Sequence, residues 1–263
     1  MIMKDTNGNR RYGALGELLR RAPVFDSECR ELFIIPRPNE TASEEQGGFT
    51  DGKYYYQMFI RRDKATNEAD NSAFLSVYDP EKHETVKVSE RLFTNHSNDI
   101  AYNPYTNELL VVHNNPNRKT VSAFDRDTLQ PTRQIKLDCN IFAMDYQPDR
   151  HRYLVGVSGA QDFRLLDDDF KPVSPEFKGI PDPLGKITQG CACDDKFIYF
   201  ILHRDSVINV YDWDGNFVTV IKMNTDRSLE PENISIVDGR IYAGCGGGKP
   251  AGMHVFEVTP KLP

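Results

Sequence analysis

The sequence predicts an all-β fold, a five-bladed β-propeller of four-stranded antiparallel blades, because one short phrase recurs five times at a nearly fixed spacing. The phrase is an apolar pair followed by an acidic residue, and its middle positions lie 42 to 46 residues apart, which is the length of a propeller blade. Those middle residues are Tyr78, Phe124, Leu166, Tyr211 and Phe256. The 18 glycines and 16 prolines also suit a fold with many short turns. We therefore expect one closed ring.

Each repeat divides into short β-branched or aromatic segments separated by turn residues. The expected strands are 48–50, 54–60, 73–78 and 85–88; 99–102, 108–113, 120–125 and 133–137; 142–146, 153–157, 163–167 and 173–177; 190–193, 197–202, 208–211 and 217–221; and 234–237, 241–243 and 253–258. The last repeat lacks a fourth strand, and an unpaired edge would expose backbone hydrogen-bonding groups. We expect residues 31–36, with the apolar run Leu32-Phe33-Ile34-Ile35, to supply that strand and close the ring.

The segment before this strand has a different character. Residues 1–29 are interpreted as an N-terminal arm, in which Leu15, Leu18 and Leu19 form the apolar stripe of a short helix at 12–21. We expect the arm to pack on one face of the ring. Residues 30–263 are then a single propeller domain.

Composition and charge exclude several classes of function. The net charge of −7 argues against binding nucleic acid, because neutralising phosphates needs a basic surface. No apolar run is long enough to cross a membrane, and the first residues do not resemble a signal peptide. The five cysteines are an odd number without metal or redox spacing, which favours reduced thiols. A cytoplasmic protein is the expectation.

Polar side chains recur at one position of the innermost strands. When the repeats are aligned on their first turns, this position holds Gln46, Asn98, Phe142, Gln189 and Asn233. Innermost strands line the central channel of a propeller, so four amides and one aromatic ring could face a common axis. We expect this row to bind a ligand. The alternative is that the amides satisfy buried backbone groups or water.

Further candidates lie around the predicted channel mouth. Glu232 is the preferred acid or base, His96 is the second candidate, and Asp99 lies beside them. The loops between second and third strands should open on the same face, and they carry Arg61, His113, His203 and Arg204. Basic and histidine residues at matching points predict a small polar or anionic ligand. Solvated loop tips are the alternative.

Three phrases at blade starts carry a resemblance to a known family. Gln46-Gly47-Gly48-Phe49, Thr188-Gln189-Gly190 and Glu230-Pro231-Glu232-Asn233-Ile234 are similar to the blade openings of plant-type glutaminyl cyclotransferases. The chain more widely resembles five- and six-bladed propellers of the gluconolactonase class. Two positions depart from the cyclotransferase pattern: Asn98 replaces a glutamate of the family, and Phe142 replaces a channel tryptophan.

The resemblance implies two kinds of chemistry. Cyclisation of an N-terminal glutamine needs a carboxyl group that moves a proton, for which Glu232 is suited, and donors that hold the amide carbonyl. Gln46, Gln189 and Asn98 could be those donors. A gluconolactonase-like site would instead hold calcium in the channel, and the oxygen ligands available are Glu232, Asn98, Asp99 and Asn233.

The sequence therefore leaves two classes of function open. The first is an enzyme of the hydrolase, lyase or acyl-transfer kind that acts on a small polar substrate. The second is a non-enzymatic scaffold that docks another protein on one face of the ring.

Overall fold

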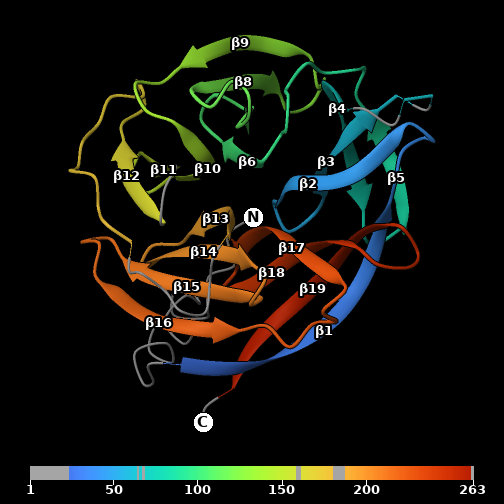
Figure 1. Ribbon diagram of the computed structural model, residues 1–263. Helices are drawn as coiled ribbons and strands as arrows, with labels where there is room; N and C mark the ends of the chain where they lie inside the picture. Colours follow the sequence, from blue (N-terminus) through green and yellow to red (C-terminus); the bar gives the residue numbers. More distant parts are fainter. Residues whose placement is uncertain (1–23, 64, 67–68, 158–160, 180–186, 262–263) are drawn as a thin grey trace.

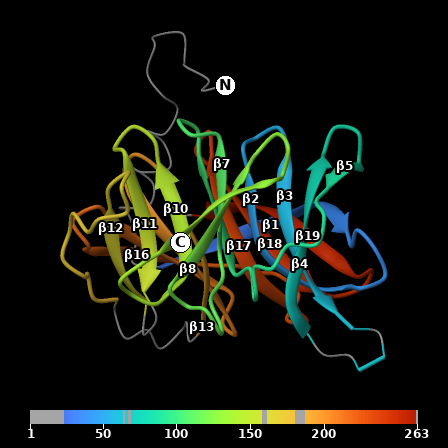
Figure 2. The ribbon, with the colours of Figure 1, turned by 90° about the horizontal axis from the view of Figure 1, so that it is seen from above.

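The structure, a computed structural model, describes residues 24–63, 65–66, 69–157, 161–179 and 187–261. All regular elements in these ranges are β-strands, which are arranged around a central axis (Figure 1). Seen from the side, many of them run between the two faces of the ring (Figure 2). The helix expected at 12–21 lies outside the described residues.

The strands form four sheets. The first contains β2 (Ala42–Thr50), β3 (Tyr55–Arg62), β4 (Ala69–Asp79) and β5 (Glu84–Val88). The second contains β6 (Asp99–Asn103), β7 (Glu108–Val112), β8 (Thr120–Asp125) and β9 (Pro131–Lys136), and the third β10 (Ile141–Gln147), β11 (Arg152–Val157) and β12 (Asp162–Leu166). The fourth runs in the order β13 (Ile187–Cys193), β14 (Phe197–His203), β15 (Val207–Asp212), β16 (Phe217–Lys222), β1 (Val24–Pro36), β19 (Gly252–Lys261), β18 (Arg240–Gly247) and β17 (Leu229–Val237).

Strand β1 joins the two ends of the chain. It pairs antiparallel with β19 from Asp26 to Pro36, and parallel with β16 at Val24 and Phe25. The strand expected at 31–36 is therefore present, and it begins earlier than the sequence predicted, at Val24. Because β19 would otherwise be an open edge, the N-terminal strand supplies the backbone partners that the last repeat lacks.

The first strand of each repeat lies nearest to the axis (Figure 1). These strands contact one another in a cycle, β2 with β6, β6 with β10, β10 with β13, β13 with β17 and β17 with β2. The next strands, such as β7 and β14, are buried almost throughout because a neighbouring sheet covers each of their faces. The outermost strands β5 and β9 are mostly exposed. The fold is thus all-β and propeller-like.

The hydrophobic core is divided among the interfaces between sheets. One cluster packs Met58 and Leu75 against Leu109 of the next sheet, and another packs Phe59 against Ile35 and Val255. The remaining clusters join the second sheet to the third, the third to β13–β16, and β13–β16 to β17–β19. Burial of apolar faces between adjacent sheets therefore stabilises the ring.

The third sheet departs from the expected pattern. The sequence predicted a fourth strand at 173–177, but this segment is not a continuous strand. It makes an isolated bridge between Phe163 and Phe177 and a hydrogen bond from Val173 N–H to the Leu165 carbonyl, and Pro172 just before it bridges Leu166. Prolines at 172 and 175 lack the backbone N–H groups that a continuous ladder requires, so the prediction of a full strand was wrong.

We expect Phe25 to be important for stability, because its fully buried ring lies where β1 meets β16. The Phe25→Ala variant should lose about 3–5 kcal/mol of unfolding free energy in urea, as is typical for a large core side chain. The matched control is Phe93→Ala, since Phe93 is 66% exposed and should change stability by less than about 0.5 kcal/mol. Equal effects of the two substitutions would contradict this role of β1.

Candidate functional site

The predicted polar row coincides with irregularities in the innermost strands. The antiparallel register shifts between Glu45 and Gly48 in β2, between Thr188 and Cys191 in β13, and at one residue in β10 and β17. The residues left out of the ladder include Gln46, Phe142, Gln189 and Glu232. A β-bulge re-aims the side chains next to it. In β17 the bulged residue is Glu232, and Asn233 is back in register.

Glycines next to the bulges allow the innermost strands to touch. A Cβ atom on Gly47 would lie 2.6 Å from the Asp99 Cα, and one on Gly190 would lie 3.1 Å from the Asn233 Cα. The Gly47 N–H also donates to the Ser97 carbonyl at 3.0 Å. The strands therefore form a tight layer across the axis at this level, with little room between them.

The carboxyl group of Asp99 lies inside this layer and is fully buried. Its Oδ2 accepts hydrogen bonds from the backbone N–H of Met144 at 3.1 Å and of Cys191 at 3.0 Å, and its Oδ1 accepts from Ile100 N–H at 3.0 Å. Burial raises the pKa of Asp99 well above its usual value, although these N–H groups oppose the shift. Asp99 thus ties β6 to β10 and β13, and its oxygens do not face the mouth.

Two of the four predicted amides bind the backbone. Asn98 Nδ2 donates to the carbonyls of Phe142 at 2.8 Å and Gln189 at 3.0 Å, and its Oδ1 accepts from Asn114. Asn233 Nδ2 donates to the Gln46 carbonyl at 2.9 Å. Each side chain therefore donates hydrogen bonds to backbone carbonyl groups near the bulges. This is the alternative role that the sequence left open.

The other two amides are available for different contacts. Gln189 Nε2 donates to Glu230 Oε1 at 2.9 Å. Gln46 Oε1 is buried, and no donor in the described part of the chain reaches it. A buried carbonyl oxygen without a donor is costly, so Gln46 is a candidate for binding a donor group of a ligand.

Glu232 is the most distinctive side chain of the row. It is only 5% exposed, and among the described residues none makes a hydrogen bond or ion pair with its carboxyl group. Burial raises the pKa of Glu232 well above its usual value, and the nearby Glu230, Glu45 and Glu44 raise it further. A carboxyl group in this state holds a proton at higher pH than normal and can act as an acid or a base.

None of the glutamates around Glu232 was among the candidate site residues chosen from the sequence. Glu45 pairs with Arg37 at 2.6 Å, and Glu44 forms an ion pair with Arg62. Gly246 forms the wall beside them, because a Cβ there would lie 3.1 Å from Glu45 Cβ and 3.5 Å from Glu232 Cγ. The signal that could have revealed this cluster is the recurrence of glutamate just before the bulges.

Two histidines lie close to the same acids. His96 is half-buried, and burial lowers its pKa below 6.5, while Glu44 and Glu230 act in the opposite direction. The imidazole is therefore neutral at pH 7. His203 Nδ1 lies 3.7 Å from Glu230 Oε1. The structure thus brings together Glu232, Gln189, His96 and His203 around a group of glutamates.

Phe142 and His113 point elsewhere. The Phe142 ring lies against Gly156 and 6.3 Å from the Phe200 ring, inside the core between the third sheet and β13–β16. His113 is buried, with Nδ1 2.7 Å from Asn95 Nδ2 and Nε2 2.8 Å from a serine hydroxyl. Burial lowers the pKa of His113 to about 4, so it is uncharged.

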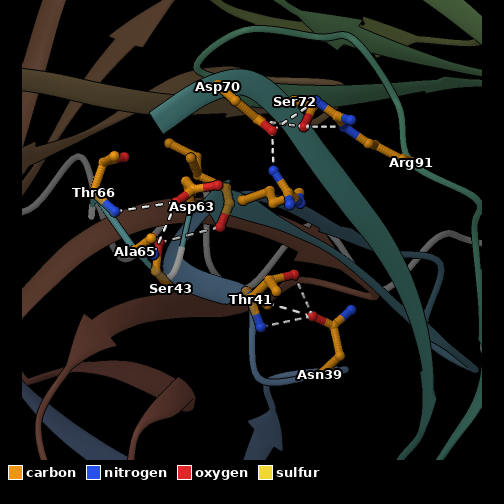
Figure 3. A network of polar contacts seen from close by, with 12 residues as sticks. Asn39, Thr41, Ser43, Asp63, Ala65, Thr66, Asp70, Ser72 and Arg91 are labelled. Atoms are coloured by element: carbon orange, nitrogen blue, oxygen red, sulfur yellow. Dashed lines mark hydrogen bonds and ion pairs between the residues drawn. The ribbon is translucent and has the colours of Figure 1, made fainter. Parts of the chain in front are cut away.

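The predicted arginines do not join the cluster. Arg61 forms an ion pair with Asp70, which also accepts from Arg91 at 2.6 Å and from Ser72. Figure 3 shows Ser72 and Arg91 side by side next to the Asp70 carboxyl group. Arg204 is exposed in the turn after β14. Neither guanidinium is placed beside Glu232 by a described contact.

The four predicted calcium ligands do not fit a metal. Asp99 directs its oxygens to backbone N–H groups, and Asn98 Oδ1 already accepts from Asn114. The residues that the structure describes also contain no group of three or more His, Cys, Asp or Glu side chains that could hold a metal ion.

The same residues include no helix with the length and apolar character to cross a membrane.

Comparisons with known proteins define the fold. The structure of the Myxococcus xanthus glutaminyl cyclase superposes with a TM-score of 0.62 at 16% sequence identity, covering 92% of this chain and 100% of that one. The likeness shows a glutaminyl cyclase-like, propeller-like fold. The Kuenenia stuttgartiensis hydrazine synthase has a TM-score of 0.46 at 14% identity, over 82% of this chain and 60% of that one. No family model and no curated protein matches the sequence.

We expect the Asp99→Ala variant to be strongly destabilised. It removes the acceptor of two buried N–H groups, on Met144 and Cys191, each of which costs about 1–3 kcal/mol when unpaired. Urea unfolding should therefore show a loss of about 2–6 kcal/mol of unfolding free energy. The control is Asp205→Ala in an exposed turn, which should stay within about 0.5 kcal/mol of the unmodified protein. Similar stabilities of the two variants would refute the role given to Asp99.

The raised pKa of Glu232 predicts a pH-dependent stability. The folded state holds the Glu232 proton more tightly than the unfolded state does. The contribution of this proton to stability is therefore complete below the pKa of Glu232 in the unfolded state, and it is lost as the pH rises through the pKa of Glu232 in the folded state. Between these two pKa values, the unfolding free energy of the unmodified protein should fall by about 1.4 kcal/mol per pH unit relative to that of Glu232→Gln. Urea unfolding across this range measures the difference. Glu81→Gln, at an exposed site, should show the same dependence of unfolding free energy on pH as the unmodified protein.

Proposed function

We propose that this protein is a five-bladed β-propeller enzyme that catalyses acyl transfer on a small polar substrate with a free amino group. The observation that supports this proposal most directly is the Glu232 carboxyl group, which is buried, has no described partner and has a raised pKa. Such a group at a β-bulge beside the central axis has the properties of a proton shuttle.

The proposed number of blades follows from how the eight-stranded sheet is read. Its two halves, β13–β16 and β17–β19 with β1, are joined only where Val24 and Phe25 pair with β16. If this short parallel junction is taken as a contact between blades, each half is a four-stranded blade. The other three sheets then complete a ring of five, in agreement with the cycle of innermost strands.

The acids near Glu232 favour a substrate with an amino group. Glu44, Glu45 and Glu230 all act on its pKa, so the local potential is negative. A protonated amine entering this site would gain charge-assisted hydrogen bonds and would lower the cost of several close carboxylates. The same negative potential would repel an anionic ligand at this point.

The proposed reaction is cyclisation of a terminal glutaminyl group. The free amine attacks the side-chain amide carbonyl, a ring C–N bond forms, and the bond to the amide nitrogen breaks with release of ammonia. The bound ammonium favours the ionised form of Glu232, which takes one proton from it to free the amine. Glu232 delivers that proton to the leaving nitrogen and then takes the second proton from the ring nitrogen. Gln46 and Gln189 supply amide groups beside the bulges for orienting the substrate.

A second candidate is a non-catalytic role, in which the ring binds a ligand or another protein without turnover. The observation in its favour is that Asn98 and Asn233 bond to backbone carbonyls and thus serve the fold. A family departure at Asn98, where a glutamate is expected, points in the same direction. Turnover measurements separate the two candidates.

The test is an assay of the purified protein with peptides that begin with glutamine. We expect release of ammonia together with formation of the cyclic terminus, detected by coupled absorbance and by mass spectrometry. Glu232→Gln should reduce kcat by about 100- to 10,000-fold, which is the typical contribution of a general acid or base. Glu81→Gln is the matched control and should keep full activity, because Glu81 is exposed in the turn just before the outermost strand β5.

Three outcomes are distinguishable. Turnover that depends on Glu232 supports the proposal. Saturable binding of the peptides without turnover, weakened by Glu232→Gln and by Gln189→Ala, supports the non-catalytic candidate with a ligand. Neither turnover nor binding for glutaminyl peptides, lactones and esters would exclude a small-substrate site at Glu232 and favour a protein-docking scaffold.

A further inference from the structure

A cavity of about 560 Å³ lies at the other end of the central axis from Glu232. It is lined by the last residues of the innermost strands and by the turns after them, among them Thr50, Tyr102, Tyr146, Cys193 and Val237. Glu232 and Gln189 belong to the opposite halves of the same strands. The tight layer around Asp99 lies between the two ends, so this cavity is a separate site.

The cavity combines apolar walls with a predominance of carboxylates. Ile100, Tyr102 and Ile234 provide apolar and aromatic surface. The acidic lining residues are Asp51, Asp145, Asp149, Asp194, Asp195 and Asp238, whereas the basic ones are Lys53 and Arg126. A volume of this size falls within the range of small-molecule sites, and the excess of acids selects for a cation.

Several polar groups around the cavity have structural partners, whereas the buried Oδ1 of Asp195 has none in the described part of the chain. Arg126 forms an ion pair with Asp51 and donates to the Tyr56 hydroxyl at 2.7 Å. Asp194 accepts from two backbone N–H groups of its own turn and from the Tyr199 hydroxyl. These residues build the walls and leave little capacity for a ligand.

Asp145 is different because it lies on a strand and not in a turn. Its Oδ2 accepts from Cys193 N–H at 2.7 Å and from the Cys193 Sγ at 3.3 Å. The side chain is partly exposed and lines the cavity, and no basic side chain in the described part of the chain pairs with it. Burial raises the pKa of Asp145 to about 6, which leaves the group largely ionised at neutral pH. This carboxylate lacks a cation.

We propose that this cavity binds a small organic amine, with the ammonium group paired to Asp145 and an aromatic or aliphatic body against Ile100, Tyr102 and Ile234. The ammonium group would supply the positive charge that the cavity lacks, and the apolar body of the amine would be buried away from water. The site is independent of the acyl-transfer chemistry proposed at Glu232, because it is built from the other ends of the strands.

The test uses phenethylamine as the probe and 2-phenylethanol as its neutral counterpart, with binding followed by calorimetry at neutral pH. Phenethylamine should bind saturably, and the alcohol should bind at least about 10-fold more weakly, since a charged hydrogen bond is worth about 1.5–3 kcal/mol. Asp145→Asn should weaken phenethylamine binding by the same factor. Val237→Trp, which fills the rim without altering Asp145, should also weaken it.

Two control variants locate the bound amine. Asp238→Asn removes a charge from the same rim, at a positive φ that asparagine tolerates, and should change the dissociation constant by less than about 3-fold. Glu232→Gln should leave it unchanged. If Glu232→Gln abolishes binding while Asp145→Asn does not, the amine binds at the opposite end and the proposal is wrong. Failure of phenethylamine to bind, or equal binding of the alcohol, also overturns it. Thermal melts of each variant check that the fold is intact.

Discussion

The hydrogen bonds of the Asp99 carboxyl group are the contact on which the arrangement of the inner strands depends. One carboxyl group accepts backbone N–H groups from β6, β10 and β13, at a place where the bulged strands cannot satisfy each other. Burying a carboxyl group is unfavourable in itself and raises its pKa, and it is tolerated here because several N–H groups would otherwise lack acceptors. The glycines on either side let the strands come close enough for these bonds, so the tight layer follows from Asp99, Gly47 and Gly190 together.

This layer divides the axis into two chemically different ends. On one side, the bulges present Glu232 beside Glu44, Glu45 and Glu230, and burial, together with repulsion from these acids, raises the pKa of Glu232. On the other side, the strands diverge into a cavity in which no basic side chain of the described residues pairs with Asp145. Both sites owe their properties to burial near the same axis. The two proposed roles differ, because the Glu232 site would exchange a proton with its substrate, whereas the Asp145 site would bind a whole cation.

Much of the candidate site could be predicted, because the bulged residues recur at the spacing of the repeats. Aligning the repeats on their first turns brought Gln46 and Gln189 into one row, with Glu232 one residue before it. The roles of the others could not be read from spacing: Asn98 and Asn233 bond to carbonyls that come from other repeats, and Phe142 turns its ring into the core. Arg61 was misleading for a different reason, because its partner Asp70 lies on the adjacent strand of the same sheet. Likewise, the prolines at 172 and 175 prevented the strand that the repeat predicted.

The sequence by itself determined the repeating strands, the all-β class and the position of the strand near residue 31 that pairs with the last repeat. These features depend on local patterns of apolar residues and turns, which act within a few residues along the chain. Only the tertiary structure decided which polar side chains are occupied and which are left without partners. That property depends on contacts between residues up to about 200 positions apart, such as Gly247 with Glu45, and on burial, which no single repeat contains.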